Sequence, residues 1–423
     1  MGYGLNDDRD LVFQDRPTRD QGLDYLPEAS SHCKDTGELA IVVQKYGGSS
    51  VATPEKIEQV ARHVAATRHS GLDVVVVVSA MGKTTENLLA LARSLVAEPP
   101  RRELDMLVST GERITMALLS MALTALGCDA VSFTGSQAGI VTDERHFDAQ
   151  IVEVRPERVD QELARGRVVI VAGYQGVSRQ REITTLGRGG SDTTAVALTA
   201  ALSAEHCEIY SDVDGIYSAD PRSIADARHL PTIDYDTMQE MAESGAKVLN
   251  ARAVDWARRH QIVIHARRTA DSAESGAARE TRVERDAPPR VAIVVDRQLA
   301  WLRAPRAARA RLLDLLSRAA VPIRDAWQDE HTTLLLSLTS VPDFTVTAEA
   351  LRAAGASEVR TDVAAVSVVG VGVGRLAETL ARALDCVPPS AFVASLSPLR
   401  LCAVLPSGDA GILEREWHAL FAS

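Results

Sequence analysis

The segment 183–192 reads Ile-Thr-Thr-Leu-Gly-Arg-Gly-Gly-Ser-Asp and contains residue types suited to binding an anion. Its three glycines let the backbone turn tightly and come close to a ligand. Arg188 lies among them and can bind a carboxylate through two parallel hydrogen bonds. Ser191 and Asp192 then begin an apolar, Ala-rich helix, whose first turn carries free N–H groups that favour anions. This combination predicts phosphate or carboxylate chemistry.

A second glycine-containing segment contains Lys45, Gly47, Gly48 and Ser49 and follows a short apolar run. The lysine ammonium could reach the β- and γ-phosphate oxygens of a nucleotide, while the two glycines offer backbone N–H groups. Taken alone, such a lysine could equally be a surface residue next to a turn. Three companion motifs favour the functional interpretation: the segment 183–192, Ser109–Arg113 and Ser211–Arg222.

Composition limits the class of protein. The 423 residues, 46% hydrophobic and 24% charged, fit two or three globular domains. A net charge of −11 and an aromatic content of 4% argue against a nucleic-acid surface. Five scattered cysteines without a Cys-x-x-Cys pair predict reduced thiols in a cytoplasmic protein. We expect no apolar stretch of membrane-spanning length and no secretory signal.

Strands and helices are expected to alternate from Leu39 onward. Apolar runs predict strands at 41–44, 74–78, 168–172, 207–210 and 262–265, with helices beginning at Pro54 and covering 102–126 and 192–202. This alternation implies an α/β fold, a mostly parallel sheet sandwiched by helices. Ligands bind at the carboxyl ends of the strands in such sheets. The glycine-containing motifs that follow strands are therefore expected at that edge.

The chain divides into five predicted parts. Residues 1–38 are polar and Asp-rich and predict a disordered extension. Residues 39–270 form the predicted α/β domain, and 271–290, rich in Ala, Glu, Arg, Asp and Pro, form a linker. Residues 291–360 and 361–423 each predict a small α+β unit, because the order strand–helix–strand recurs there.

The motifs together resemble those of the aspartate kinases, which belong to the amino-acid-kinase superfamily. The resemblance covers about Val42 to Arg267. It rests on motifs in the family's order: Lys45–Ser50, Ser79–Thr85, Ser109–Arg113, Phe133–Gly139, Gly187–Asp192, Ser211–Arg222 and Gly245–Leu249. It implies an amino-acid-kinase fold followed by two ACT domains, which usually sense lysine or threonine and help to form dimers.

The resemblance also implies how an amino acid would be bound. Arg188 would hold the α-carboxylate of the substrate and Glu112 its ammonium, and this pair selects a free α-amino acid. In isolation, Glu112 would more often be a solvated residue on a helix surface. Thr85 and Ser191 would add hydrogen bonds from their hydroxyl groups.

A further set of residues is implied for ATP. Lys45 and Lys247 would approach the phosphates, and Asp192 would organise Lys45 and the reacting groups. Mg²⁺ would be held mainly by phosphate oxygens and water, with few protein ligands. The later segment resembles the family's nucleotide-contacting segment at Ser211, Asp212, Tyr217 and Arg222. Taken alone, its acidic residues could also belong to an ordinary Asp-Gly turn.

Two segments resemble other nucleotide-binding motifs only in part. Gly82-Lys83-Thr84 ends like a P-loop, but Val77 stands where the first glycine would be. The segment 370–374 alternates glycine and valine, but Arg375 replaces the third spaced glycine of a dinucleotide loop. We therefore predict a strand end there.

The chain departs from the family's pattern at several places. Tyr174 lies where Phe is usual, and Asn250 where His is frequent; neither change removes an essential charge. The first C-terminal unit lacks an Asp-Lys-Pro-Gly-like loop, and the second has 370–375 in place of a Ser-His-Pro-Gly-like loop. These losses motivate the hypothesis that lysine or threonine feedback is weak, absent or altered.

The sequence therefore predicts a cytoplasmic enzyme that uses ATP and Mg²⁺ to phosphorylate the β-carboxylate of L-aspartate. This reaction is the first step towards aspartate semialdehyde and the lysine, threonine and methionine family, and feedback insensitivity would suit a dedicated pathway. A homodimer or higher homo-oligomer through the ACT-like units is implied by the resemblance, without a nucleic-acid or membrane partner. Two alternatives stay open: a kinase for a related amino acid, admitted by a pocket changed at Tyr174, and a non-catalytic regulatory subunit.

Overall fold

The computed structural model describes residues 39–270, 279–319, 321–339, 341, 344–374 and 377–422. The chain from Leu39 onward forms one compact unit. The predicted disordered extension and residues 271–278 of the predicted linker lie outside the described residues, as does Arg375. Among the described residues the cysteines are free thiols: Cys128, Cys207, Cys386 and Cys402.

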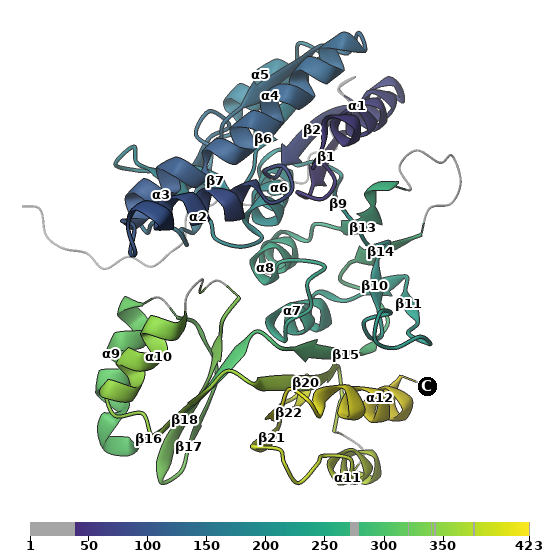
Figure 1. Cartoon of the computed structure of the whole chain (residues 1–423). Helices are drawn as coiled ribbons and strands as arrows, with labels where there is room; N and C mark the ends of the chain where they lie inside the picture. The colour runs from purple at the N-terminus through teal and green to yellow at the C-terminus, as the bar shows by residue number, and fades with distance from the viewer. Residues whose placement is uncertain are drawn as a thin grey trace, which may run out of the picture. The chain divides into compact units, whose positions relative to one another are not determined.

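An eight-stranded sheet forms the centre of the first domain, in the order β12-β14-β13-β9-β1-β2-β6-β3 (Figure 1). Neighbouring strands run parallel except β13 and β14. The strands are β1 Ile41–Tyr46, β2 Asp73–Val78, β3 Ala130–Phe133, β6 Val168–Ala172, β9 His206–Ser211, β12 Thr232–Ile233, β13 Ile264–Arg268 and β14 Glu280–Val283. The predicted, mostly parallel sheet is confirmed.

Helices cover both faces of this sheet. Helices α1 (Pro54–His69) and α4 (Thr110–Ala125) pack on one face, and α6 (Gly190–Ala201) and α8 (Ala251–His260) on the other. The central strands β2 and β6 are continuous apolar runs because both their faces are buried. All residues from Gly190 to Thr199 are buried, so α6 is the central helix of its layer.

The predicted helix over 102–126 is divided in the structure. Helix α3 (Arg101–Val108) is separated from α4 by the single residue Ser109. Helix α2 (Thr84–Leu95) precedes α3. Within the described residues, the stretch Arg101–Ala125 is long and apolar enough to cross a membrane by length and composition alone. The expectation that no apolar stretch reaches that length is therefore wrong. Two of its leucines, Leu119 and Leu123, are fully buried against the sheet.

A second sheet, β5-β4-β7-β8, and the hairpin β10-β11 complete the first domain. Their strands are β4 Ile140–Thr142, β5 Ile151–Val154, β7 Gln175–Ser178, β8 Ile183–Thr185, β10 Ile216–Tyr217 and β11 His229–Leu230. The remaining helices are α5 Glu157–Leu163 and α7 Tyr235–Glu243. Strand β8 ends at Thr185, two residues before Gly187, so it leads directly into the glycine-rich loop that carries Arg188.

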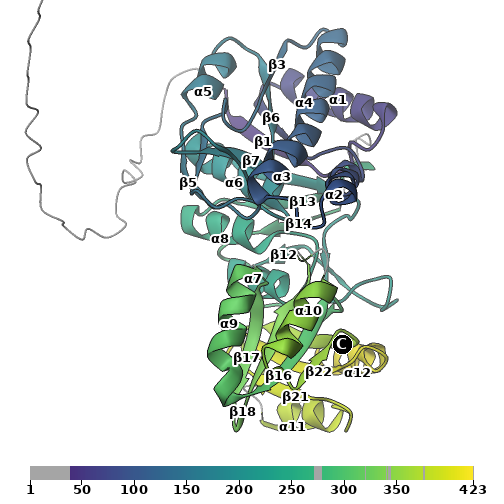
Figure 2. The same ribbon diagram turned by 60° about the vertical axis from the view of Figure 1, so that its left-hand side comes forward.

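The C-terminal region contains two four-stranded sheets, β17-β18-β16-β19 and β15-β20-β22-β21. They pack face to face through an apolar layer that includes Trp301 and Val404. Helices α9 and α10 cover the outer face of the first sheet, and α11 and α12 that of the second (Figure 2). The helices are η2 Arg306–Ala308, α9 Arg309–Arg318, α10 Phe344–Ala353, α11 Ala377–Asp385 and α12 Ala410–Phe421. The strands are β15 Val291–Asp296, β16 Leu299–Pro305, β17 Ile323–Gln328, β18 His331–Ser337, β19 Glu358–Arg360, β20 Val363–Gly370, β21 Val393–Leu396 and β22 Arg400–Pro406.

The two α+β units differ from the predicted boundaries at two strands. Strand β14 lies in the predicted linker but pairs with β13 and extends the main sheet. Strand β15 was expected to begin the first unit, at residue 291, but it pairs with β20 of the second. The first unit is therefore inserted between two strands of the second. Strand β20 ends at Gly370, as the strand-end interpretation of the segment 370–374 predicted.

Candidate active site

An ion pair connects the first strand with the central helix. Lys45 is the fifth residue of β1, and its Nζ lies 2.7 Å from Oδ1 of Asp192 in the first turn of α6. Both residues are less than one-tenth exposed. Gly47 lies beneath the ammonium, because a Cβ built at this glycine would lie 3.5 Å from Lys45 Nζ. A buried ammonium above a glycine turn is well placed to meet a phosphate.

Glu112 is a buried carboxylate with unused hydrogen-bonding capacity. It lies in the first turn of α4 and is 3% exposed. Its Oε1 accepts a hydrogen bond from the backbone N–H of Ala80 at 3.1 Å, while Oε2 has no hydrogen-bond partner among the described residues. Burial raises the pKa of Glu112 to about 7. Such a group requires a cation for full stabilisation of its charge.

The glycine-rich loop presents Arg188 at the surface. Gly187 and Gly189 have positive φ angles of 75° and 72°, a conformation that glycine adopts without steric cost. The Arg188 side chain between them is exposed. Ser191 lies at the start of α6 next to Gly173, where an added Cβ would come within 2.7 Å of Ser191 Oγ.

Tyr174 lies within electrostatic range of both proposed amino-acid contacts. Burial is the main cause that raises its pKa to about 12, and a hydrogen bond with Thr185 opposes the shift. The charge of Glu112 raises this pKa further and that of Arg188 lowers it. The backbone of Tyr174 has a φ of 67°, which is rare for a residue with a side chain. The charges of Glu112 and Arg188 therefore both act on Tyr174.

The predicted nucleotide-contacting segment is less closely packed. Ser211 ends β9, and its carbonyl accepts a hydrogen bond from Thr269. The Tyr217 hydroxyl donates to Asp214 at 2.9 Å.

Charged residues later in this segment lie near Lys247. Arg222 is largely exposed and pairs with Asp220 at 2.8 Å. That hydrogen bond is the main cause that lowers the pKa of Asp220, and the charge of Lys247 contributes to the same shift. The exposed Asp212 in turn acts on Arg222. Lys247 therefore shares this neighbourhood.

Some predicted residues are not joined to the Lys45–Asp192 pair. No hydrogen bond or ion pair within the described ranges connects that pair with Thr85 or Lys247. Thr85 lies half-buried in the first turn of α2, a helix without buried residues. Ser49 is exposed, and its carbonyl accepts a hydrogen bond from Lys56 at 2.7 Å.

The sequence analysis missed a buried carboxylate, Asp105 on α3. Asp105 is fully buried and accepts hydrogen bonds from Thr185 at 2.5 Å and from the Phe147 backbone at 3.0 Å, with His146 Nδ1 2.6 Å away. It thereby ties α3 and the loop before Asp148 to the strand that leads into the glycine-rich loop. Asp105 lies seven residues before Glu112, a spacing that places both on one face of the predicted helix over 102–126. This spacing is the sequence signal that could have identified Asp105.

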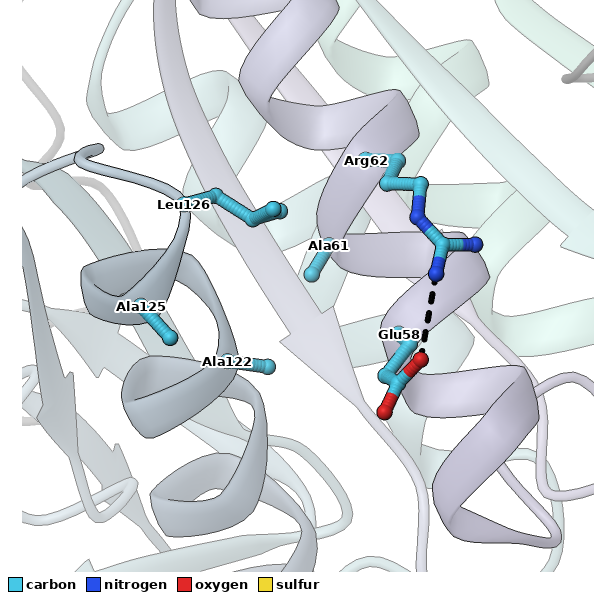
Figure 3. A pocket seen from close by; sticks show the side chains of 6 residues that line it. All are labelled: Glu58, Ala61, Arg62, Ala122, Ala125 and Leu126. Atoms are coloured by element: carbon cyan, nitrogen blue, oxygen red, sulfur yellow. Dashed lines mark hydrogen bonds and ion pairs between the residues drawn. The ribbon is translucent and has the colours of Figure 1, made fainter.

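Two further observations limit the site. A hollow between α1 and α4 lies away from the predicted residues and is lined by Glu58, Ala61, Arg62, Ala122, Ala125 and Leu126 (Figure 3). Glu58 and Arg62 form an exposed ion pair at 3.1 Å on its rim. In the part of the chain that the structure describes, no group of three or more His, Cys, Asp or Glu side chains could hold a metal ion.

Residues 40–266 match the model of the amino acid kinase family. The chain belongs to this family. This match contains five of the predicted site residues: Lys45, Glu112, Arg188, Asp192 and Lys247.

Within the family, the chain is similar to aspartokinases. It is 59% identical to the aspartokinase of Mycobacterium tuberculosis over 230 residues, which span 54% of this chain and only 55% of that relative. It is 40% identical to the aspartokinase of Thermus thermophilus over 400 residues, 90% of this chain and 99% of that relative. The structure of E. coli aspartokinase III in complex with aspartate and ADP matches its fold with a TM-score of 0.76 and 23% identity, over 90% of this chain and 100% of that one.

Proposed function

We propose that this protein transfers the γ-phosphoryl group of ATP to the β-carboxylate of L-aspartate, giving 4-phospho-L-aspartate and ADP. The observation that carries the proposal is Glu112, a buried carboxylate with one unpartnered oxygen and a pKa raised to about 7. The charges of both Glu112 and Arg188 act on the pKa of Tyr174, which supports their being near the same side chain. A buried anion and an exposed guanidinium match the two charged ends of a free amino acid.

The amino acid would be held at both ends. Its ammonium would donate to Oε2 of Glu112, which supplies the missing counter-charge for the carboxylate. The Arg188 guanidinium would bind the α-carboxylate through two hydrogen bonds. Hydroxyl groups of Thr85 and Ser191 would bind the remaining oxygens. The β-carboxylate would then point towards the phosphate-binding residues, already ionised and in need of no general base.

The nucleotide would be held by the opposite set of residues. The phosphate oxygens would be bound by Lys45, Lys247 and the N–H groups of Gly47 and Gly48. The rest of ATP would contact Ser49 and four residues of the later segment: Ser211, Asp212, Tyr217 and Arg222. Asp192 would keep the Lys45 ammonium in place through the 2.7 Å pair. Bound Mg²⁺ would supply positive charge to the phosphates. The ion would be held mainly by phosphate oxygens and water, with few protein ligands.

Phosphoryl transfer follows from this arrangement. A β-carboxylate oxygen attacks the γ-phosphorus in line, the new P–O bond forms, and the bond to the β–γ bridging oxygen breaks, so that ADP leaves with the electron pair. The two lysines neutralise the charge on the transferred group. Positioning and electrostatic stabilisation are therefore the main contributions of the protein.

The decisive experiment measures ADP release with ATP, Mg²⁺ and L-aspartate, with hydroxylamine present to trap an acyl phosphate. An aspartate-dependent hydroxamate supports the proposal. Turnover with another amino acid, but not with aspartate, would instead indicate a related kinase whose pocket is altered at Tyr174. ATP binding without turnover on any acid would indicate a regulatory subunit.

We also propose a cytoplasmic homodimer or higher homo-oligomer assembled through the two C-terminal units, with weak, absent or altered feedback by lysine and threonine. The two α+β units follow the catalytic domain as regulatory units would, while their sequences lack the expected effector loops. Such an enzyme would suit a dedicated pathway that consumes aspartyl phosphate.

A further inference from the structure

Asn250 makes contacts that extend beyond the helix on which it lies. It is the N-cap of α8, where its Oδ1 accepts hydrogen bonds from the backbone N–H groups of Arg252 at 2.9 Å and Ala253 at 3.4 Å. Its Nδ2 donates to the carbonyl oxygen of Arg188 at 2.9 Å. The same Oδ1 also accepts from the hydroxyl of Thr193, on α6, at 3.4 Å. One amide thus joins the glycine-rich loop, α6 and α8.

A helix cap alone requires only the acceptor half of this side chain. Serine and aspartate cap helices about as well as asparagine, since the cap needs an oxygen that accepts from the first-turn N–H groups. The donor half of Asn250 is instead used on a carbonyl 62 positions away in the sequence. The identity of the residue is therefore explained by the glycine-rich loop and not by the helix.

The loop packs directly against this amide. A Cβ built at Gly189 would lie 2.4 Å from Nδ2 of Asn250, so the close approach requires glycine there. The loop has two left-handed glycines, at 187 and 189, and its Arg188 side chain is exposed. A loop of this kind has much backbone freedom to lose. The hydrogen bond at the Arg188 carbonyl removes part of that freedom at the residue that must bind the substrate.

Helix α8 holds the same loop at a second point. The Arg252 guanidinium donates to the carbonyl oxygen of Leu186 at 3.3 Å and pairs with Asp148 at 2.8 Å. Asn250 and Arg252 together bracket the loop from one helix end. Lys247 lies three residues before Asn250, in the segment that leads into this end.

We propose that Asn250 is a positioning residue that fixes the backbone of Arg188 relative to the segment carrying Lys247. This inference rests on the proposed function for its kinetic consequences. Asn250 thereby links the glycine-rich loop, whose Arg188 would bind the amino-acid carboxylate, to the segment whose Lys247 would approach the phosphates. Asn250 is not among the residues that we propose to contact either substrate.

The test uses two substitutions of Asn250 in the full-length protein. Asn250→Asp keeps an oxygen for the helix cap and adds a negative charge that a helix N-terminus favours, but it places an oxygen against the Arg188 carbonyl. Asn250→Ser keeps a capping hydroxyl that is too short to reach the carbonyl. A matched control is Asp234→Asn, at the N-cap of α7, where Oδ1 accepts from the Thr237 N–H at 2.9 Å.

We expect both Asn250 variants to raise the KM for aspartate roughly 5- to 10-fold, the loss of one well-aligned hydrogen bond. The KM for ATP should change less than about 2-fold, and thermal stability should remain close to wild type for Asn250→Asp, because its cap is retained. The Asp234→Asn control should leave both KM values unchanged. An unchanged KM for aspartate in both Asn250 variants, or equal changes in the two KM values, would overturn the proposal.

A second measurement does not depend on the substrate. Hydrogen exchange of the unliganded protein should become faster in residues 186–192 in both Asn250 variants and stay unchanged in the Asp234→Asn protein. Unaltered exchange in that segment would refute the proposal even if the kinetics changed. If wild-type protein forms no hydroxamate with aspartate while exchange responds as expected, the proposed function fails and the positioning role of Asn250 stands.

Discussion

The Lys45 ammonium lies 2.7 Å from the Asp192 carboxylate, and the two residues come from elements 147 positions apart in sequence. The pair connects the end of β1 to the first turn of α6, the two places where a parallel sheet and a helix N-terminus favour anions. Because both side chains are buried, each depends on the other for stabilisation of its charge. The lysine that we propose to bind phosphate is therefore held by Asp192 in the unliganded structure.

Removing the charge of Asp192 should impair catalysis. Asp192→Asn leaves the Lys45 ammonium without its counter-charge and free to leave the phosphate position, so we expect kcat to fall on the order of 10-fold or more. Steady-state kinetics with saturating ATP and aspartate measures this. Asp129→Asn, which removes an exposed pair with Arg167, is the control and should change kcat little. Equal activities of the two variants would contradict the role given to Asp192.

The buried Glu112 should make aspartate binding depend on pH. Since its pKa is about 7 in the free protein, the carboxylate becomes protonated as the pH falls from 8 to 6. A neutral Glu112 binds an ammonium poorly, so the KM for aspartate should rise up to about 10-fold over the pH unit below 7. Glu112→Gln should have a high KM that no longer varies with pH. A parallel pH dependence in wild type and variant would show that another group titrates.

The same residue should limit stability at neutral and alkaline pH. A carboxyl whose pKa is raised on folding favours the folded state below its unfolded value, and this advantage is lost as the pH rises through about 7. Above that pH the buried charge costs on the order of 3 kcal/mol at most. Denaturant unfolding without substrate should therefore find Glu112→Gln more stable than wild type at pH 8, with a smaller difference at pH 5. A greater loss of stability in Glu112→Gln at pH 8 than at pH 5 would reverse the expected sign.

Arg188 should affect one substrate far more than the other. Arg188→Ala removes the bidentate partner of the α-carboxylate, so the KM for aspartate should rise at least about 10-fold, with little change in the KM for ATP. Varying each substrate at saturation of the other gives both values. Arg181→Ala, an exposed arginine in the preceding turn, is the control. Equal effects of Arg188→Ala on the two substrates would mean that its partner is misassigned.

Feedback by amino acids should be weak. Because both C-terminal units lack the loops expected to hold an effector, millimolar lysine plus threonine should leave the rate of ADP release nearly unchanged. Assays at aspartate concentrations near KM are the most sensitive. A clear inhibition curve would refute the hypothesis and locate an effector site in residues other than those loops.

Local patterns explain which parts of the fold could be predicted. The valine-rich strands and the Ala-rich helix after Asp192 are signalled by residues close in sequence, and the mostly parallel sheet was predicted from them. The pairing of β15 could not be predicted, because its apolar residues fit either C-terminal sheet. Only tertiary packing determines that β15 pairs with β20. The contacts of Asp105 and Asn250 join residues 41 to 80 positions apart. Single-sequence patterns do not carry that information.

Because β15 pairs with β20, the first C-terminal unit is an insertion that could be excised from the chain without breaking this strand pair. Asp296 and Ala365 are opposite each other in this antiparallel pair, so a short reverse turn could replace the intervening chain and leave the second sheet continuous. Such an excision would expose the apolar face of the second sheet, which includes Cys402 and Val404. Another polypeptide segment or a second subunit would have to cover that face. The same excision would keep β15 and β20 in one chain, whereas a chain cut at residue 296 would separate β15 from its partner strand.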